Sequence, residues 1–287
     1  VIDLRNNGGG HLTEATALTG LFIDNGPVVQ LRNANGRISR LDDPDPVPRS
    51  AYSGPLIVLV NRYSASASEI FAAAIQDYER GVVVGQQTYG KGTVQNLYAL
   101  DQYVRRNQDE LGQLTLTIGK YYRVTGESTQ NRGVIPDIEL PSYIDTDNTG
   151  ESSRDTALPW DKIKPSRYKK NPPMEDSINQ LKELHKERRK TDPELIFLLK
   201  DIEESSLYRK QTTVSLNLNN RISEREAREE RKEAIDKIRI KANDNDEAQE
   251  ENENRDINLN ETATIATDLV KLNNPGSKSN QMAKRVE

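Results

Sequence analysis

Two uninterrupted apolar runs on either side of a helical pattern constrain the fold of this chain most. PLIVLV at 55–60 and GVVVG at 81–85 lack polar alternation, which is typical of strands buried on both faces of a parallel sheet. Between them, the residues at 66–79 have the apolar spacing of a helix. Strands that alternate with helices predict an α/β domain.

The remaining patterns predict an α/β part at 1–140 and a charged, mainly helical part at 141–287. The first part has further expected strands in VIDL at 1–4 and QLTLTIGKYYRV at 113–124, and a helix at 12–23. The second part has expected helices at 176–190, 193–205, 223–242 and 261–274, an edge strand at 213–219 and a solvated acidic linker at 244–256.

Composition narrows the class of function. The 287 residues carry a net charge of −5 with both signs interspersed, which argues against a nucleic-acid partner. There is no cysteine, so we expect neither a disulfide framework nor a thiolate metal site, and two histidines are too few for a His-rich metal site. No apolar run approaches the roughly 20 residues of a membrane span. The chain starts inside a strand pattern without a methionine or a signal peptide, so we expect a C-terminal portion of something longer.

Three serines, Ser64, Ser66 and Ser68, lie where the strand pattern passes into the helix pattern. Ser66 and Glu69 form an S-x-x-E capping box, and a helix cap is the commoner explanation for such a serine. The same box places Ser66 at the junction, where its own N–H and that of the next residue would point at a developing oxyanion. Ser66 is therefore the best candidate for a nucleophile, with a simple cap as the alternative.

A serine nucleophile needs a base. His11 is the only histidine of the α/β part, and no local pattern supports a Ser-His-Asp triad with it. Asp77 falls on the same helix face as Ser66 but roughly 16 Å along the axis, so we expect it to support the structure rather than to touch the serine hydroxyl.

Lys91 is the remaining candidate base. GQQTYGK at 85–91 matches the first seven positions of a P-loop, but Gly92 replaces the Ser or Thr that would hold magnesium. The residues after it alternate like a strand, whereas a P-loop opens a helix, so phosphate binding is disfavoured. A lysine acts as a base where burial disfavours its charged form, and Gln95 would lie on the same strand face to orient the amine. A surface lysine in a β-turn is the alternative.

Four motifs, in this order and spacing, carry a resemblance to a known family. They are DLRNNGGG, NRYSASASEIFAAAIQD, VVVGQQTYGKGTVQ and RGVIPDIELP. Together they resemble the C-terminal processing peptidases, which are Ser-Lys proteases, and most closely the tail-specific members of the bacterial periplasm. The charged helical part after DTALPWDKI resembles the C-terminal domain of those members, so the resemblance covers nearly the whole chain.

The resemblance implies a fold and a site. The fold is a partial protease core related to the crotonase and ClpP superfamily, followed by a mainly α-helical C-terminal domain. Ser66 is implied as the nucleophile, Lys91 as the general base and Gln95 as the residue that positions the lysine. Oxyanion-hole groups are implied at Gly9, Gly10 and Ala67, and supporting roles at Glu69, Asp77 and Thr88.

The implied function is a serine endopeptidase that cleaves proteins near their C-termini and needs no cofactor. Its implied partners are protein substrates with accessible C-terminal tails and a membrane-anchored adaptor, in the periplasm of a Gram-negative bacterium. The PDZ domain and the first core strands of the family are not in this chain, so residues 1–287 alone are expected to show weak activity or none. The alternative is a non-catalytic module that binds tails or docks on an adaptor through the charged helices at 176–242.

Overall fold

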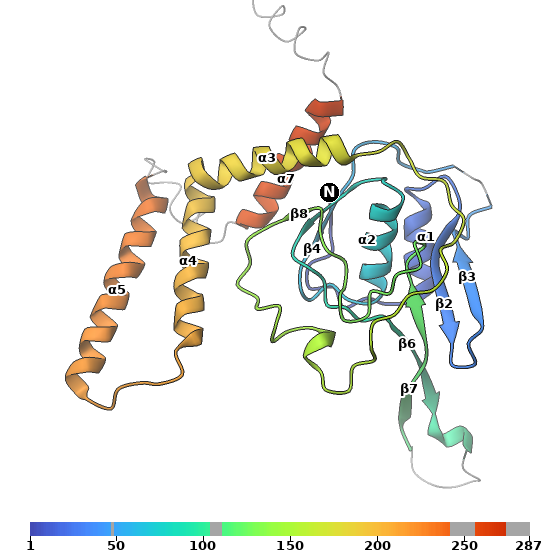
Figure 1. The fold of residues 1–287 in the computed structure, drawn as a ribbon, viewed down its shortest axis with the longest axis horizontal. Coiled ribbons are helices and arrows are strands. Elements are labelled where there is room, and N and C mark those ends of the chain that lie inside the picture. Colours follow the sequence, from blue (N-terminus) through green and yellow to red (C-terminus); the bar gives the residue numbers. More distant parts are fainter. Residues whose placement is uncertain (47–48, 104–110, 242–255, 274–287) are drawn as a thin grey trace, which may run out of the picture. The chain divides into compact units, whose positions relative to one another are not determined.

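The computed structural model describes residues 1–46, 49–103, 111–241 and 256–273. The chain divides into two compact units (Figure 1). One, the core unit, comprises Ile2–Asp137 and Thr146–Met174; the other, the helical unit, comprises Val1, Ile138–Asp145 and Glu175–Glu287. The expected mixed α/β core and helical C-terminal part are confirmed.

A βαβ unit forms the centre of the core unit. Strands β1 (Ile2–Asp3), β4 (Ile57–Val60) and β5 (Val82–Gly85) lie side by side in parallel. All residues of β4 and β5 are buried, as their continuous apolar runs predict. Helix α2 (Ala67–Asp77) connects these two strands, so its N-terminus lies just after the end of β4.

Helix α2 is buried on nearly all sides, which explains its apolar IFAAAI sequence. Phe71 and Ala72 pack with the parallel strands in one apolar cluster. Ile70 and Ala74 belong to a second cluster, which also includes residues of α1 (Leu12–Gly20) and of an antiparallel sheet. The helix therefore has little freedom to shift relative to either sheet.

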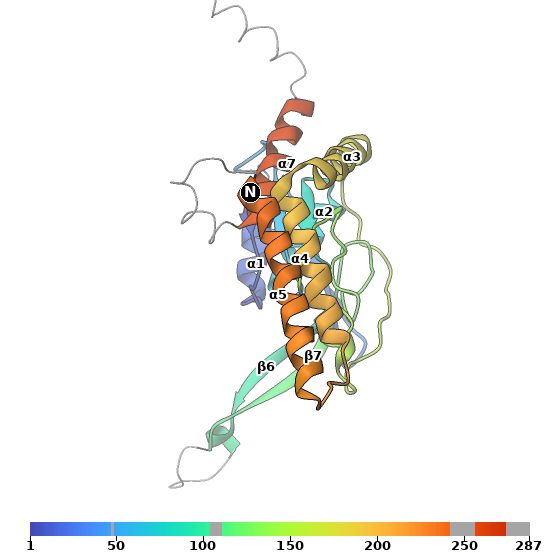
Figure 2. The ribbon, with the colours of Figure 1, turned by 90° about the vertical axis from the view of Figure 1, so that its left-hand side faces the viewer.

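The antiparallel sheet has the strand order β3-β2-β7-β6. Its strands are β2 (Pro27–Asn33), β3 (Ile38–Asp42), β6 (Thr93–Ala99) and β7 (Gln113–Tyr122). The ribbon of β6 and β7 extends beyond the rest of the core unit in both views (Figure 1 and Figure 2), and the short helix η1 (Leu100–Tyr103) follows β6. Another short helix, η2 (Glu151–Ser153), lies in the later part of this unit.

The β2–β3 hairpin is not among the elements predicted from the sequence. Its turn contains Asn35-Gly36, where Gly36 has φ +82°, and the Gly36 N–H donates to the Asn33 oxygen at 2.9 Å. An Asn-Gly pair between two apolar segments is a strong local signal for a hairpin, so this pair could have located it.

The helical unit contains β8 (Ile138–Glu139) and four described helices: α3 (Glu175–Thr191), α4 (Pro193–Lys210), α5 (Leu218–Lys241) and α7 (Ile257–Asn273). All four expected helices are confirmed, and Figure 2 shows α4 and α5 side by side. Within the described ranges, no helix combines the length and the apolar character needed to cross a membrane.

The edge strand expected at 213–219 is wrong. Residues 211–217 have no regular secondary structure, and α5 starts at Leu218. The side chain of Asn217 caps this helix: its Oδ1 accepts the N–H groups of Asn219 at 2.9 Å and Asn220 at 3.3 Å. The acidic linker expected at 244–256 lies, except for its last residue, outside the described residues.

Candidate active site

Ser66 occupies a strained turn between β4 and α2. It is the N-cap residue of α2 and has φ 58° and ψ −114°, whereas an N-cap residue usually has an extended backbone. Positive φ is uncommon outside glycine and costs on the order of 1–3 kcal/mol. A serine on a strained strand-to-helix turn is also the geometry that exposes the nucleophile in α/β hydrolases. This turn is where a chemical role for Ser66 would be expected.

The two neighbouring serines have structural roles. The Ser64 hydroxyl is buried and donates to the Leu4 oxygen at 2.8 Å. The Ser68 hydroxyl, also buried, donates to the Asn7 oxygen at 3.1 Å. These two bonds hold the segment after β1 against the turn that carries Ser66. Of the three serines, Ser66 is the one whose hydroxyl is not used to join these segments.

Gly9 lies directly against the Ser66 turn. It has φ +100°, and a Cβ atom on it would lie 2.8 Å from the Ala67 nitrogen and 2.8 Å from the Ser66 Cβ. Only glycine tolerates both this conformation and this approach. The Gly9 N–H donates to Asn7 Oδ1 at 2.9 Å, while a Cβ atom on Gly10 would meet nothing within 4 Å. Glycine at position 9 therefore allows the segment after β1 to lie close to the Ser66 turn. Its own N–H is already hydrogen-bonded to Asn7.

Ala67 is the first residue of α2. The first N–H groups of a helix have no acceptor within the helix, and the positive end of the helix dipole is located there. The structure thus places a donor suited to an anion next to Ser66 and opposite Gly9.

Lys91 and Gln95 contact each other through their side chains. Lys91 Nζ donates to Gln95 Oε1 at 3.2 Å, although a bulge interrupts the strand between Val94 and Gln95. Lys91 is half-buried and Gln95 is exposed. A strand, β6, begins two residues after Lys91, so this segment does not form the strand–loop–helix unit of a P-loop.

The carboxylate of Glu69 joins the segments that carry Ser66 and Lys91. Its Oε2 accepts the Ser66 N–H at 2.8 Å and the Lys91 N–H at 2.9 Å. Its Oε1 accepts the Thr88 hydroxyl at 2.6 Å and the Gly90 N–H at 2.7 Å. Glu69 is fully buried. Two of the expected supporting residues, Glu69 and Thr88, therefore lie together at this connection.

Burial raises the pKa of Glu69 to about 7, although the hydrogen bonds from its four donors lower it. The ordinary value is 4.5, so the folded protein binds a proton that the unfolded chain releases between pH 4.5 and about 7. Glu69 then contributes stability that is complete below pH 4.5 and is lost as the pH rises to about 7.

This linkage predicts a stability difference that depends on pH. The free energy of unfolding of the wild type, relative to that of Glu69→Gln, should fall by about 3 kcal/mol between pH 4.5 and pH 7 and then stay level. Urea unfolding of both proteins across this range measures the difference, because glutamine cannot titrate. A difference that is flat, or that rises with pH, would contradict the raised pKa of Glu69.

Asp77 lies at the other end of α2 and is paired with Arg123. The Asp77 Oδ1 lies 2.5 Å from Arg123 Nη2, and both side chains are nearly buried. Arg123 follows β7 directly and also donates to Gln76 Oε1 at 2.8 Å. As expected, Asp77 does not contact Ser66. Its ion pair with Arg123 joins the C-terminus of α2 to the end of β7.

Neither histidine supports a Ser-His-Asp triad. His11 is the exposed N-cap residue of α1 and makes no side-chain cap hydrogen bond. His185 belongs to the helical unit, where its Nδ1 lies 2.7 Å from Glu261 Oε1 and both side chains are buried. Arg188 also pairs with Glu261, at 2.8 Å, so this histidine is part of a buried polar cluster between α3 and α7.

Two residues at the site were missed by the sequence analysis. The Tyr121 hydroxyl donates to the Lys91 oxygen and lies 3.2 Å from the Ser66 oxygen. Gln130 Oε1 accepts the Gly92 N–H at 2.8 Å. Both residues are buried polar side chains, but the sequence carries no signal for the distant carbonyl or N–H that each one reaches.

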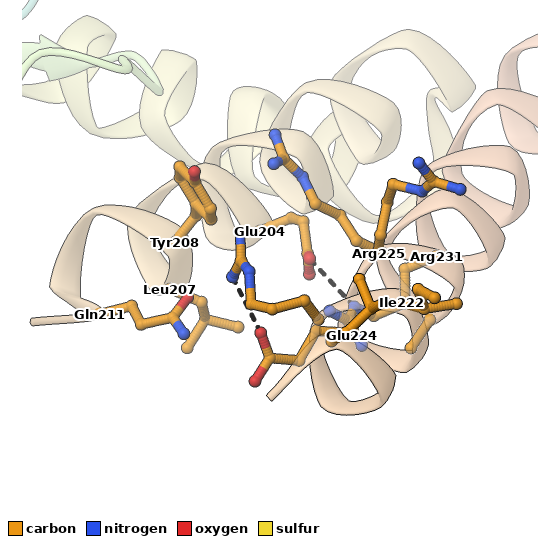
Figure 3. A pocket seen from close by; sticks show the side chains of 12 residues that line it. Glu204, Leu207, Tyr208, Gln211, Ile222, Glu224, Arg225 and Arg231 are labelled. Atoms are coloured by element: carbon orange, nitrogen blue, oxygen red, sulfur yellow. Dashed lines mark hydrogen bonds and ion pairs between the residues drawn. The ribbon is translucent and has the colours of Figure 1, made fainter. Parts of the chain in front are cut away.

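A separate groove of about 950 Å³ lies between α4 and α5 in the helical unit (Figure 3). Two ion pairs cross or border it, Arg231 with Glu204 at 2.9 Å and Arg221 with Glu224 at 3.0 Å. Apolar side chains such as Leu207 also line it. None of the expected site residues lines this groove, and the described residues contain no group of three or more His, Asp or Glu that could hold a metal ion.

Comparisons with known proteins find relatives of both parts of the chain. Residues 1–140 match the model of peptidase family S41, and residues 144–271 match the model of the C-terminal domain of tail specific protease. The tail-specific protease of Haemophilus influenzae is 47% identical over 227 residues, which are 78% of this chain and 32% of that protein. The carboxy-terminal-processing protease of Bartonella bacilliformis is 40% identical over 139 residues, 48% of this chain and 30% of that protein.

Among solved structures, a photosystem II D1 C-terminal processing protease is 33% identical, with a TM-score of 0.41, and the match covers 50% of this chain and 35% of that one. The chain spans about a third of the length of the curated relatives it matches.

Proposed function

Since residues 1–140 of this chain belong to peptidase family S41, we propose that the chain carries the catalytic residues of a serine endopeptidase that cleaves proteins near their C-termini. The observation that supports this proposal most is the strained turn at Ser66, which Glu69 joins to the segment of Lys91. Backbone strain at a helix N-terminus, next to a lysine held by an amide, suits nucleophilic catalysis rather than capping alone.

The proposed reaction begins with proton transfer from the Ser66 hydroxyl to Lys91 Nζ. Lys91 Nζ, which lies 3.2 Å from Gln95 Oε1, is the proposed acceptor of this proton. Ser66 Oγ forms a bond to the carbonyl carbon of the scissile peptide, whose oxygen becomes negatively charged. The Ala67 N–H and the Gly10 N–H would hold that oxygen, because the Gly9 N–H is engaged by Asn7.

The tetrahedral intermediate then loses its amine. The carbon–nitrogen bond breaks, Lys91 returns its proton to the leaving nitrogen, and an ester to Ser66 remains. A water molecule attacks this ester while Lys91 takes up one of its protons. The bond between the carbonyl carbon and Ser66 Oγ then breaks, Lys91 returns the proton to Ser66 Oγ, and the acid is released. Gln95 orients the amine throughout, and Glu69, Thr88 and Asp77 support the segments around it.

The substrates are proposed from the names of the relatives. The names tail-specific protease and carboxy-terminal-processing protease suggest protein substrates with accessible C-terminal tails. A periplasmic location and a membrane-anchored adaptor are further proposals, which rest on the resemblance of the motifs alone. Because the relatives are about three times longer than the matched part, we propose that residues 1–287 alone have weak activity or none. Activity is therefore assayed in the protein that carries this chain at its natural length.

A second candidate function is a non-catalytic docking module. The groove between α4 and α5, with apolar side chains beside arginines, is the feature that favours it (Figure 3). Such a module would need neither the strained Ser66 turn nor the contact of Lys91 with Gln95, so the protease is the better supported function.

A fluorophosphonate probe tests the proposed nucleophile directly. We expect one covalent adduct, located at Ser66 by peptide mass spectrometry, because this reagent reacts with an activated serine. Ser64 and Ser68 serve as internal controls, since they lie on the same peptide and their hydroxyls are bonded to backbone oxygens. An adduct on either control serine, or a protein that cleaves peptides without being labelled, would refute the assignment of Ser66.

A further inference from the structure

The same two side chains, those of Glu69 and Tyr121, contact the backbone N–H and carbonyl groups of both Ser66 and Lys91. Both N–H groups donate to Glu69 Oε2, at 2.8 Å and 2.9 Å. The single O–H of Tyr121 is shared between both carbonyl oxygens: it donates to the Lys91 oxygen and lies 3.2 Å from the Ser66 oxygen. One acceptor and one donor side chain therefore connect two residues that belong to different elements of the core unit.

Tyr121 comes from a third element that is itself firmly placed. It lies in β7 opposite Leu31 of β2, and its side chain is 2% exposed within the second apolar cluster. Its own N–H donates to the Gly92 oxygen at 2.9 Å, next to Lys91. The hydroxyl is thus held by the antiparallel sheet rather than by the loop or the turn that it contacts.

The Tyr121 hydroxyl is a permanent hydrogen-bond donor. Burial raises the pKa of Tyr121 well above its ordinary value, so the phenol keeps its proton across the working range of an enzyme. The Ser66 oxygen also accepts the Ile70 N–H at 3.0 Å within the helix, so its second lone pair faces the phenol.

We propose that Tyr121 is a positioning residue for the Ser-Lys reaction, whose hydroxyl keeps the turn of Ser66 and the loop of Lys91 at a constant separation. This inference rests on the proposed function. Ser66 lies at the start of α2 and Lys91 in the loop after β5, and the Tyr121 hydroxyl joins their carbonyl oxygens as Glu69 joins their N–H groups. A displacement of about 1 Å between reacting groups can cost about 100-fold in rate.

The neighbouring Tyr122 provides a matched control. It lies in the same strand and is also buried, but its hydroxyl donates to Asp161, at 3.1 Å from Oδ1. Tyr121→Phe and Tyr122→Phe each remove one buried phenolic oxygen. Tyr121→Phe is expected to lower kcat about 10-fold or more with KM within about twofold of the wild type, whereas Tyr122→Phe keeps kcat within about twofold.

Two further variants separate positioning from packing. 4-Aminophenylalanine at position 121 retains a donor and should restore most of kcat, while 4-methylphenylalanine has a similar volume, lacks the donor and should not. This pair also decides the question if Tyr121→Phe fails to fold. All assays run below the unfolding transition of each variant, as established by thermal unfolding.

The outcomes distinguish this inference from the proposed function. If Ser66→Ala abolishes cleavage but Tyr121→Phe, or the 4-methylphenylalanine variant, cleaves like the wild type, Tyr121 does not position the pair. Equal losses of kcat in the Tyr121 and Tyr122 variants at equal stability would also overturn the inference. Full cleavage by Ser66→Ala would overturn the proposed function, and the inference with it.

Discussion

Alanine in place of Lys91 is expected to lower kcat by about 10⁴-fold or more, as far as Ser66→Ala does. The proposed base and nucleophile act as one unit, because an alkoxide cannot form without an acceptor for its proton. The Ser66→Ala, Lys91→Ala double variant should therefore be no slower than either single variant. The measurement is the turnover of a peptide or protein substrate by the protein at its natural length.

Lys170→Ala is the control for this prediction. Lys170 also lies in the core unit, but its amine pairs with Glu79 at 2.9 Å on the surface, so kcat should stay within about twofold. Thermal unfolding establishes that each variant is folded. The Ser-Lys mechanism would be wrong if Lys91→Ala retained wild-type turnover, or if the losses in the double variant multiplied as they do for independent residues.

Gly9→Ala is the substitution with the next largest expected effect. The added Cβ would lie 2.7 Å from the Ala65 oxygen and 2.8 Å from the Ala67 nitrogen, which are backbone atoms of the Ser66 turn. The φ of +100° adds strain for any residue other than glycine. Either the segment after β1 or the turn itself must move, so kcat should fall about 100-fold or more, because the oxyanion donors and the nucleophile lose their alignment.

Gly10→Ala provides the matched comparison. A Cβ atom there would meet nothing within 4 Å, and alanine keeps the N–H that we propose as an oxyanion donor. We expect kcat within about threefold of the wild type for Gly10→Ala, as measured beside Gly9→Ala on the same substrate. If Gly10→Ala lost as much as Gly9→Ala, the close approach at Gly9 would not explain the need for glycine in this motif.

Local sequence patterns were sufficient to predict most of the helices and the buried strands. The apolar runs of β4 and β5 and the spacing of α2 predict two buried strands and the helix between them, because full burial of both strands leaves no polar alternation. The spacing of apolar residues likewise predicted the four described helices of the helical unit. The stretch at 213–219 alternates like a strand but pairs with no strand among the described residues, and the Asn217 cap starts a helix there instead.

The motifs also indicated which residues form the candidate site, but they did not indicate how those residues contact one another. The capping box singled out Ser66 among three serines, and the strand after Lys91 argued against a P-loop. The reason that Ser64 and Ser68 are unsuitable lies in their bonds to Leu4 and Asn7, about 60 residues earlier in the chain. No local pattern reports such contacts.

The contacts of Tyr121, which connect the segments of Ser66 and Lys91, can be recognised only in the tertiary structure. Tyr121 is 55 residues from Ser66 and 30 from Lys91, and the sequence around it shows only a strand with two adjacent tyrosines. Which of the two hydroxyls reaches Ser66 and Lys91 depends on how β7 pairs with β2 and how α2 packs beside that sheet. Residue types and short-range periodicity therefore determine the elements and the chemistry available, whereas the packing of distant elements decides which of those groups meet.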